Sequence, residues 1–78
     1  MRLYIKTQYK NICDHDNVSA VEIITEQGHR QILPNHAPMI GKIMKGEIAF
    51  TQNNKKETIT INNDGILSVQ DNVVTIFC

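Results

Sequence analysis

The chain has 78 residues, and its 8 Lys and Arg balance its 8 Asp and Glu to a formal net charge of zero. A chain of this length forms one domain, residues 1–78, with a small core and a correspondingly small net stability. The balanced charge excludes the basic field that nucleic-acid binding requires, and no apolar run is long enough to cross a bilayer. The two cysteines can form at most one disulfide, so we expect a reducing compartment, the cytosol of a prokaryote.

Apolar and polar residues alternate with period two along most of the chain, which is typical of half-buried antiparallel strands. In chain order, the apolar pairs that share a face are Leu3 with Ile5, Val21 with Ile23, Ile48 with Phe50, Ile59 with Ile61, Leu67 with Val69, and Val74 with Ile76. Turns are predicted at residues 27–28, 53–56, 63–65 and 71–72, with Gly65 free to take a positive φ. Only Ala37–Met44 could hold a short helical turn. Many short strands with regular turns indicate an all-β domain, a small sandwich or barrel.

Residues 32–38, Ile-Leu-Pro-Asn-His-Ala-Pro, place two prolines around one histidine. Each proline fixes its own φ, removes a backbone donor and keeps the preceding residue out of the helical region. We therefore expect a stiff, extended or turned loop that presents the imidazole of His36. No second ligand or nucleophile lies at a recognisable spacing, so an interface or structural role of His36 is favoured over a catalytic or metal-binding one.

Three other segments could carry chemistry. Cys13-Asp14-His15-Asp16 is a cluster of possible metal ligands, but adjacent residues of an extended segment alternate faces and cannot all converge on one ion. His29-Arg30 could meet acidic groups of a partner or form a solvated turn. The apolar cluster within residues 39–44 is either core or an adaptable docking surface. No phosphate-binding, zinc-protease, nucleophile-elbow or Cys-x-x-Cys motif is present, so we expect no cofactor, no metal and no catalytic residue.

The segment Ile32 to Pro38 closely resembles the G-I-L-P-[GN]-H-A-P-L motif of the epsilon subunit of bacterial F-type ATP synthases, which is called delta in mitochondria. Residues 3–7 look like the opening strand of that family, and Gly46-Glu47-Ile48 resembles its L-x-x-G-x-[VI] segment. Residues 65–76 follow the pattern G-[GF]-[IL]-x-E-V-x-x-N-x-V-T-[VI]. Because the resemblance covers essentially the whole chain, the chain is identified as similar to the N-terminal domain of this family.

The resemblance implies a flattened antiparallel β-sandwich of about ten short strands, with little or no helix. It also implies a non-catalytic rotor subunit that binds the gamma subunit and the c-ring, and so couples proton translocation to ATP synthesis or hydrolysis. Such a subunit lies at the cytoplasmic face of the bacterial plasma membrane and does not insert into it. In family terms, residues 26–42 face the ring and gamma. The expected partner-binding residues are Gln8, His29, Arg30, Pro34, Asn35, His36, Pro38, Met39 and Ile40.

The chain also departs from the family pattern. Gly28-His29-Arg30-Gln31 stands where the family commonly has Gly-Glu-Phe/Leu-Gly, so a ring contact of His29 is expected to differ in sign from the usual acidic one. Most members continue into a C-terminal hairpin of two helices, whereas this sequence stops at Cys78, so we expect no inhibition through that arm and no nucleotide binding. The alternative function is that of a free-standing β-sandwich that binds a small ligand or a metal through His36 and residues 13–16.

Overall fold

Nine strands and no helix make up the computed structural model, which describes residues Met1–Cys78. The predicted all-β class is confirmed, and no helix able to span a bilayer occurs. The strands are β1 (Arg2–Lys6), β2 (Asn11–His15), β3 (Val18–Thr25), β4 (Gly28–Ile32), β5 (Met39–Ile43), β6 (Gly46–Gln52), β7 (Lys55–Ile61), β8 (Gly65–Gln70) and β9 (Val73–Phe77).

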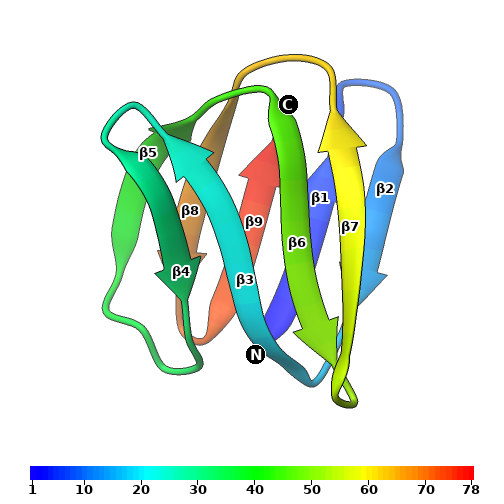
Figure 1. Ribbon diagram of the computed structural model, residues 1–78, viewed down its shortest axis with the longest axis vertical. Coiled ribbons are helices and arrows are strands. Elements are labelled where there is room, and N and C mark those ends of the chain that lie inside the picture. The colour runs from blue at the N-terminus through cyan, green and yellow to red at the C-terminus, as the bar shows by residue number, and fades with distance from the viewer.

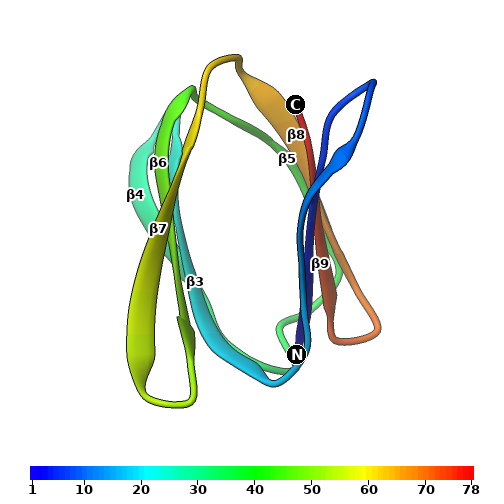
Figure 2. The same cartoon turned by 90° about the vertical axis from the view of Figure 1, so that its right-hand side faces the viewer.

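The strands lie in two facing layers (Figure 1; Figure 2). One layer has the order β4-β3-β6-β7, and the other has the order β5-β8-β9-β1-β2. A single pairing between β3 and β5, Thr25 opposite Ile43, joins the layers into one curled sheet. The sandwich therefore has two lateral ends. At one end β4 lies across from β5, and at the other β7 lies across from β2 (Figure 1).

One strand pair departs from the antiparallel arrangement that the sequence predicts. β1 and β9 run parallel, with partners from Arg2 opposite Val73 to Lys6 opposite Phe77. All the other pairings are antiparallel. Parallel neighbours need a long connection between them, and here that connection is nearly the whole chain.

The interior is apolar, and no polar or charged residue is buried in it. Each of the six pairs expected from the period-two pattern faces the interior, and the core also includes Cys13, Val18, Ile32 and Ile43, which those pairs do not contain. Ile59 alone among the paired residues is only partly buried, and it packs against the core from β7. Burial of these side chains supplies the main favourable term for folding, about 25 cal/mol for each Å² of apolar surface removed from water.

The short hairpins follow from residues that tolerate a left-handed backbone. Asn53 and Asn54 both have positive φ, 52° and 63°, between β6 and β7. Asp71 and Asn72 have φ of 52° and 62° between β8 and β9. Two consecutive positive φ values are typical of the type I′ turn, whose twist matches that of the flanking strands.

Two local predictions are wrong. Gly65 does not take a positive φ. It is required by close contact instead, because a Cβ there would lie 2.6 Å from the carbonyl oxygen of Phe77. The helical turn suggested within Ala37–Met44 is a strand, β5, which pairs with β8 from Met39 opposite Val69 to Ile43 opposite Gly65. Met39 and Ile43 are four residues apart, a spacing that fits one face of a helix and one face of a strand equally well.

Candidate functional site

The loop between β4 and β5, residues 33–38, is exposed along its whole length. Asn35 has a φ of 64°, and its backbone N–H donates to Oδ1 of Asn72, 2.8 Å away in the β8–β9 turn. His36 donates from Nδ1 to the carbonyl oxygen of Ala37 at 2.7 Å, since a carbonyl oxygen can only accept. Pro34 and Pro38 restrict the loop on either side. The structure thus has a loop at the predicted residues, and the hydrogen bond from Asn35 connects it to the β8–β9 turn.

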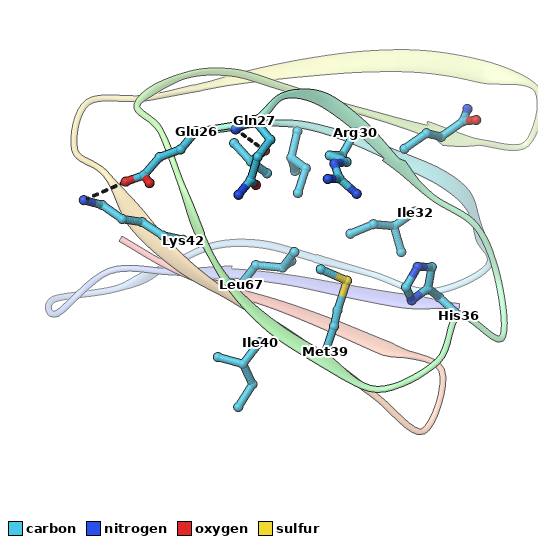
Figure 3. A pocket seen from close by; sticks show the side chains of 13 residues that line it. Glu26, Gln27, Arg30, Ile32, His36, Met39, Ile40, Lys42 and Leu67 are labelled. Atoms are coloured by element: carbon cyan, nitrogen blue, oxygen red, sulfur yellow. Dashed lines mark hydrogen bonds and ion pairs between the residues drawn. The ribbon is translucent and has the colours of Figure 1, made fainter.

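A cavity of about 340 Å³ opens beside this loop, between β4 and β5 (Figure 3). It exists because β4 and β5 are not paired with each other, although β3 and β5 join the layers nearby at Thr25 and Ile43. Its lining includes four of the predicted site residues, Arg30, His36, Met39 and Ile40. Across its opening, Nζ of Lys42 lies 3.5 Å from Oε1 of Glu26.

His29 and Arg30 are neighbours in β4 and point to opposite faces of it, because side chains alternate along a strand. Arg30 shares the inward face with Ile32, whereas His29 shares the outer face with Glu22 of β3. On that outer face Nζ of Lys56 lies 2.9 Å from Oε2 of Glu22, and this contact lowers the pKa of Glu22, with a smaller contribution from His29. The sequence leaves a partner contact and a solvated turn open for these two residues, and the structure places them in a strand, on two different surfaces.

The outer face of β5, β8 and β9 carries the main exposed apolar surface. Ile40 is 82% exposed, Ile66 58% and Phe77 52%. Ile66 lies directly opposite both Lys42 on β5 and Phe77 on β9, so the three apolar side chains are cross-strand or diagonal neighbours. We call Ile40, Ile66 and Phe77 the outer apolar patch. A soluble monomer rarely leaves such a cluster uncovered, and clusters of this kind mark sites of protein association.

Cationic side chains flank the outer apolar patch. In the strand register, Lys6 of β1 lies opposite Phe77 of β9, and Lys42 of β5 lies opposite Ile66 of β8. Farther along β1, Arg2 and Lys6 each place their charged group 4.9 Å from the centre of the Tyr4 ring. An apolar centre with a polar, charged rim is the usual anatomy of a protein interface.

The expected partner-binding residues include Ile40 but not Ile66 or Phe77. The sequence does contain an indication of these two, because each is an apolar residue at a position where the period-two pattern expects a polar one. Leu67 and Val69 are the buried set of β8, and Val74 and Ile76 are that of β9. Ile66 and Phe77 stand out of phase with those sets.

Gln8 does not join the other predicted site residues. It is exposed in the connection between β1 and β2, at the top of the molecule, whereas the β4–β5 loop is at the bottom (Figure 1). A partner that contacts both would have to extend along the strands.

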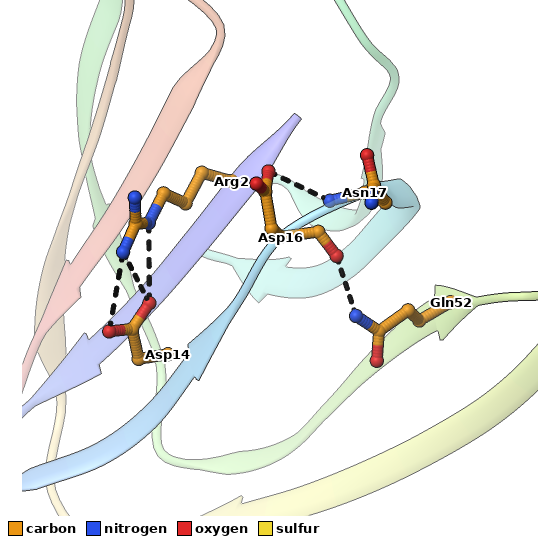
Figure 4. Close-up of polar contacts among 5 residues, drawn as sticks. All are labelled: Arg2, Asp14, Asp16, Asn17 and Gln52. Atoms are coloured by element: carbon orange, nitrogen blue, oxygen red, sulfur yellow. Dashed lines mark hydrogen bonds and ion pairs between the residues drawn. The ribbon is translucent and has the colours of Figure 1, made fainter.

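The four residues Cys13-Asp14-His15-Asp16 do not converge. Cys13 is buried in the core, while Asp14 is exposed and its Oδ1 lies 3.2 Å from the guanidinium of Arg2 (Figure 4). His15 stacks on Phe50 with ring centres 5.1 Å apart. Oδ1 of Asp16 accepts from the backbone N–H of Asn17 at 2.9 Å. No group of three or more His, Cys, Asp or Glu side chains gathers in a way that could hold a metal ion.

The cysteines are unfavourable nucleophiles. Burial, followed by the charges of Asp14 and Glu57, raises the pKa of the Cys13 thiol to about 11. Burial also raises the pKa of Cys78 above its usual value. Both thiols are free, and a raised pKa keeps them protonated near neutral pH, in the unreactive form.

Relatives of the chain share one description. It is 49% identical over 49 residues to the ATP synthase epsilon chain of Desulfitobacterium hafniense, a match that covers 63% of this chain and 36% of the relative. It is 29% identical over 72 residues to the ATP synthase epsilon chain of Pediococcus pentosaceus, covering 92% of this chain and 51% of the relative. The chain thus spans about half, or less, of the length of these relatives.

Solved structures agree on the fold. A chain in the mitochondrial ATP synthase of Euglena gracilis, a structure of OSCP, F1 and c-ring, superposes with a TM-score of 0.86 at 26% identity, covering 96% of this chain and 48% of that one. A chain in the central stalk and c-ring of the Tetrahymena thermophila mitochondrial ATP synthase superposes at 0.74 with 19% identity, covering 99% and 61%. The family description "ATP synthase, Delta/Epsilon chain, beta-sandwich domain" matches residues 1–78. The chain therefore belongs to the family of ATP synthase delta/epsilon β-sandwich domains.

Proposed function

We propose that this domain is a non-catalytic rotor component of an F-type ATP synthase, held between the gamma subunit and the c-ring. It would couple rotation of the ring to the catalytic head, as a peripheral component at the cytoplasmic face of a bacterial plasma membrane. The family match, the relatives named as epsilon chains and the Euglena assembly support membership of such a complex. The observation that carries the proposal is the outer apolar patch, because adjacent exposed apolar side chains are typical of surfaces that bind another protein.

The chemistry of the chain suits a passive component. Its interior holds no polar or charged residue, its thiols have raised pKa values, and no three His, Cys, Asp or Glu side chains gather in a way that could hold a metal ion. Transmission of torque requires a stiff body with firm contacts, and a close-packed sandwich supplies that stiffness.

We assign the two partners to two surfaces. The outer apolar patch, which includes Ile40, is the proposed contact with gamma, because a permanent contact between subunits has an apolar centre. The loop at 33–38 is the proposed contact with both the c-ring and gamma, because its exposed, restricted backbone loses little entropy on docking. His29 lies at the start of β4, on a different face from the patch, and would meet the ring in place of the family's usual acidic residue.

The test is co-purification of the chain with a bacterial gamma subunit, followed by titration of purified gamma into purified chain. We expect a stable one-to-one complex. Ile66→Asp should weaken it by about tenfold or more, because it places a charge at the centre of the contact. Ile24→Asp is the matched control, since it makes the same change at an exposed isoleucine on the outer face of the other layer.

Two loop variants complete the test. His36→Ala and Pro38→Ala should weaken the binding of gamma more than they lower the melting temperature, because both residues are exposed. A chain that ignores gamma, or an Ile66→Asp variant that binds as well as the Ile24→Asp variant, would refute the assignment.

A further inference from the structure

Arg30 occupies a position where the fold expects an apolar side chain. It lies on the inward face of β4, in register with the buried Ile23 of β3 and two residues from the buried Ile32 (Figure 3). The family pattern has Phe or Leu there. The guanidinium of Arg30 makes no hydrogen bond to any other residue, and none of the three ion pairs of the chain includes it. Arg30 is exposed, so water reaches its guanidinium, and an anion that enters the space between the layers would meet a cation without a protein partner.

The space in front of Arg30 is not filled by a side chain from the other layer, because the residue that faces it there is Gly41. Gly41 lies on the inward face of β5, between Met39 and Ile43. A Cβ built at Gly41 would meet no atom nearer than Cε of Met39, 4.0 Å away. The cavity of about 340 Å³ is therefore set by a missing side chain on one wall and a charged one on the opposite wall.

The remaining walls define the ligand class. Ile23, Ile32, Met39 and Leu67 supply an apolar part of the lining, and Thr25, Gln27, Gln31 and His36 add uncharged polar groups beside it. Glu26 and Lys42 lie 3.5 Å apart at its opening and offset each other's charge, which leaves the single positive charge of Arg30. A dianion such as phosphate would bring a second negative charge that Arg30 alone does not balance, and the apolar part of the lining disfavours that charge. A monocarboxylate fits, because guanidinium binds carboxylate through two parallel hydrogen bonds.

We propose that the cavity between β4 and β5 is a binding site for a small aliphatic monocarboxylate, with its carboxylate on Arg30 and its chain against Ile23, Ile32 and Leu67. The volume lies at the lower end of the range for small-molecule sites, which suits a short acid. This site is inferred without use of the proposed stalk function, but the cavity adjoins both proposed contacts, because Ile40 of the outer apolar patch and His36 of the β4–β5 loop also line it.

The experiment is a titration of the ¹⁵N-labelled 78-residue chain with hexanoate, followed by NMR, with the uncharged hexanamide as the matched probe. Hexanoate should bind saturably with a Kd of about 1 mM, and hexanamide about tenfold or more weakly. The amide shifts should concentrate at Ile23, Arg30, Met39 and Leu67. Shifts that concentrate at Ile66 and Phe77 would mean adsorption to the outer apolar patch and would overturn the proposal.

Three variants separate the charge from the space. Arg30→Met keeps an apolar side chain of similar length and should weaken hexanoate about tenfold without affecting hexanamide. Gly41→Leu fills the cavity and should abolish the binding of both probes. Lys55→Met removes an exposed cation on β7 and should change neither. A melting curve for each variant confirms the fold. Equal affinity of wild type and Arg30→Met for hexanoate, or undiminished binding by folded Gly41→Leu, would refute the site.

Discussion

The two lateral ends of the sandwich differ in how side chains fill the space between the two layers. At the β2/β7 end, Cys13 is buried and the ring of His15 stacks on Phe50, with ring centres 5.1 Å apart, so side chains from the two layers meet. At the β4/β5 end, Gly41 supplies no side chain, and an exposed ion pair of 3.5 Å spans the opening. We call these the filled end and the open end.

This difference between the two ends indicates which contacts contribute most to holding the two layers together. Burial of large apolar and aromatic groups is worth several kcal/mol, whereas an exposed ion pair contributes between nothing and about 1 kcal/mol. The filled end should therefore contribute more through side-chain contacts between the layers, whereas the open end relies on the pairing of Thr25 with Ile43 and can accept a ligand or a partner in its cavity. Both candidate contacts, the β4–β5 loop and the outer apolar patch, lie at or next to the open end.

The largest expected effect is at the filled end. Phe50 is only 2% exposed, and Phe50→Ala should lower the free energy of unfolding by about 3–5 kcal/mol, because it removes the ring and leaves a cavity. Urea unfolding monitored by circular dichroism measures this. A loss below about 1 kcal/mol would mean that the filled end is not where the layers are held.

Alanine substitutions at Gly65 and Gly41 compare a tightly packed position with one beside the cavity. Gly65→Ala places a Cβ 2.6 Å from the backbone oxygen of Phe77, so the β8–β9 pair must shift, and we expect a loss of about 1–3 kcal/mol. Gly41→Ala meets only a flexible methionine end at 4.0 Å, so its effect should stay within about 0.5 kcal/mol. The two variants are compared by the same urea titration. Similar losses at both sites would show that the open end is not open.

A pH series tests the burial of Cys13 at the filled end. The pKa of this thiol is about 11 in the folded chain and 9.0 for an unperturbed cysteine. Between these values the unfolded chain binds fewer protons, so stability from this group is complete below pH 9 and declines as the pH rises toward 11. Urea midpoints at pH 8 and at about pH 10.5 should therefore differ more for wild type than for Cys13→Ala, which cannot lose that proton. If the urea midpoints of wild type and Cys13→Ala changed equally with pH, the raised pKa of Cys13 in the folded chain would be contradicted.

The smallest effect is expected at the ion pair of the open end. Lys42→Met should change the free energy of unfolding by less than about 1 kcal/mol, because both side chains are well exposed to water. Added salt should reduce even this difference. Thermal melts at low and high salt check it, with Lys55→Met as the control for removing an exposed cation. A larger loss for Lys42→Met would mean that the pair clamps the open end.

The sequence predicts the core well because burial on a strand leaves a period of two. The inward sets from Leu3 with Ile5 to Val74 with Ile76 are all identified from it. It fails at β4, because His29, Arg30 and Gln31 are polar on both faces and resemble a turn. The parallel pairing of β1 and β9 also escapes it, since alternation within a strand does not identify its neighbour.

The candidate site could be predicted only in part. The two prolines indicate the stiff loop without any structure, because their effect on the backbone is local. The outer apolar patch is assembled from β5, β8 and β9, and the cavity from β4 and β5, so both depend on the register between strands distant in sequence. Arg30 could be recognised as unusual from the family pattern, but its direction into the interlayer space follows only from its register with Ile23.

The pairing of β1 with β9 has a consequence for synthesis of the chain on the ribosome. Among the nine strands, β1 leaves the ribosome before all the others, yet its partners from Val73 to Phe77 leave after all the others. Until then β1 has only β2 beside it, and an isolated two-stranded hairpin is marginally stable in water. The nascent chain is therefore expected to stay protease-sensitive until β9 has left the exit tunnel, and then to close in one late, cooperative step.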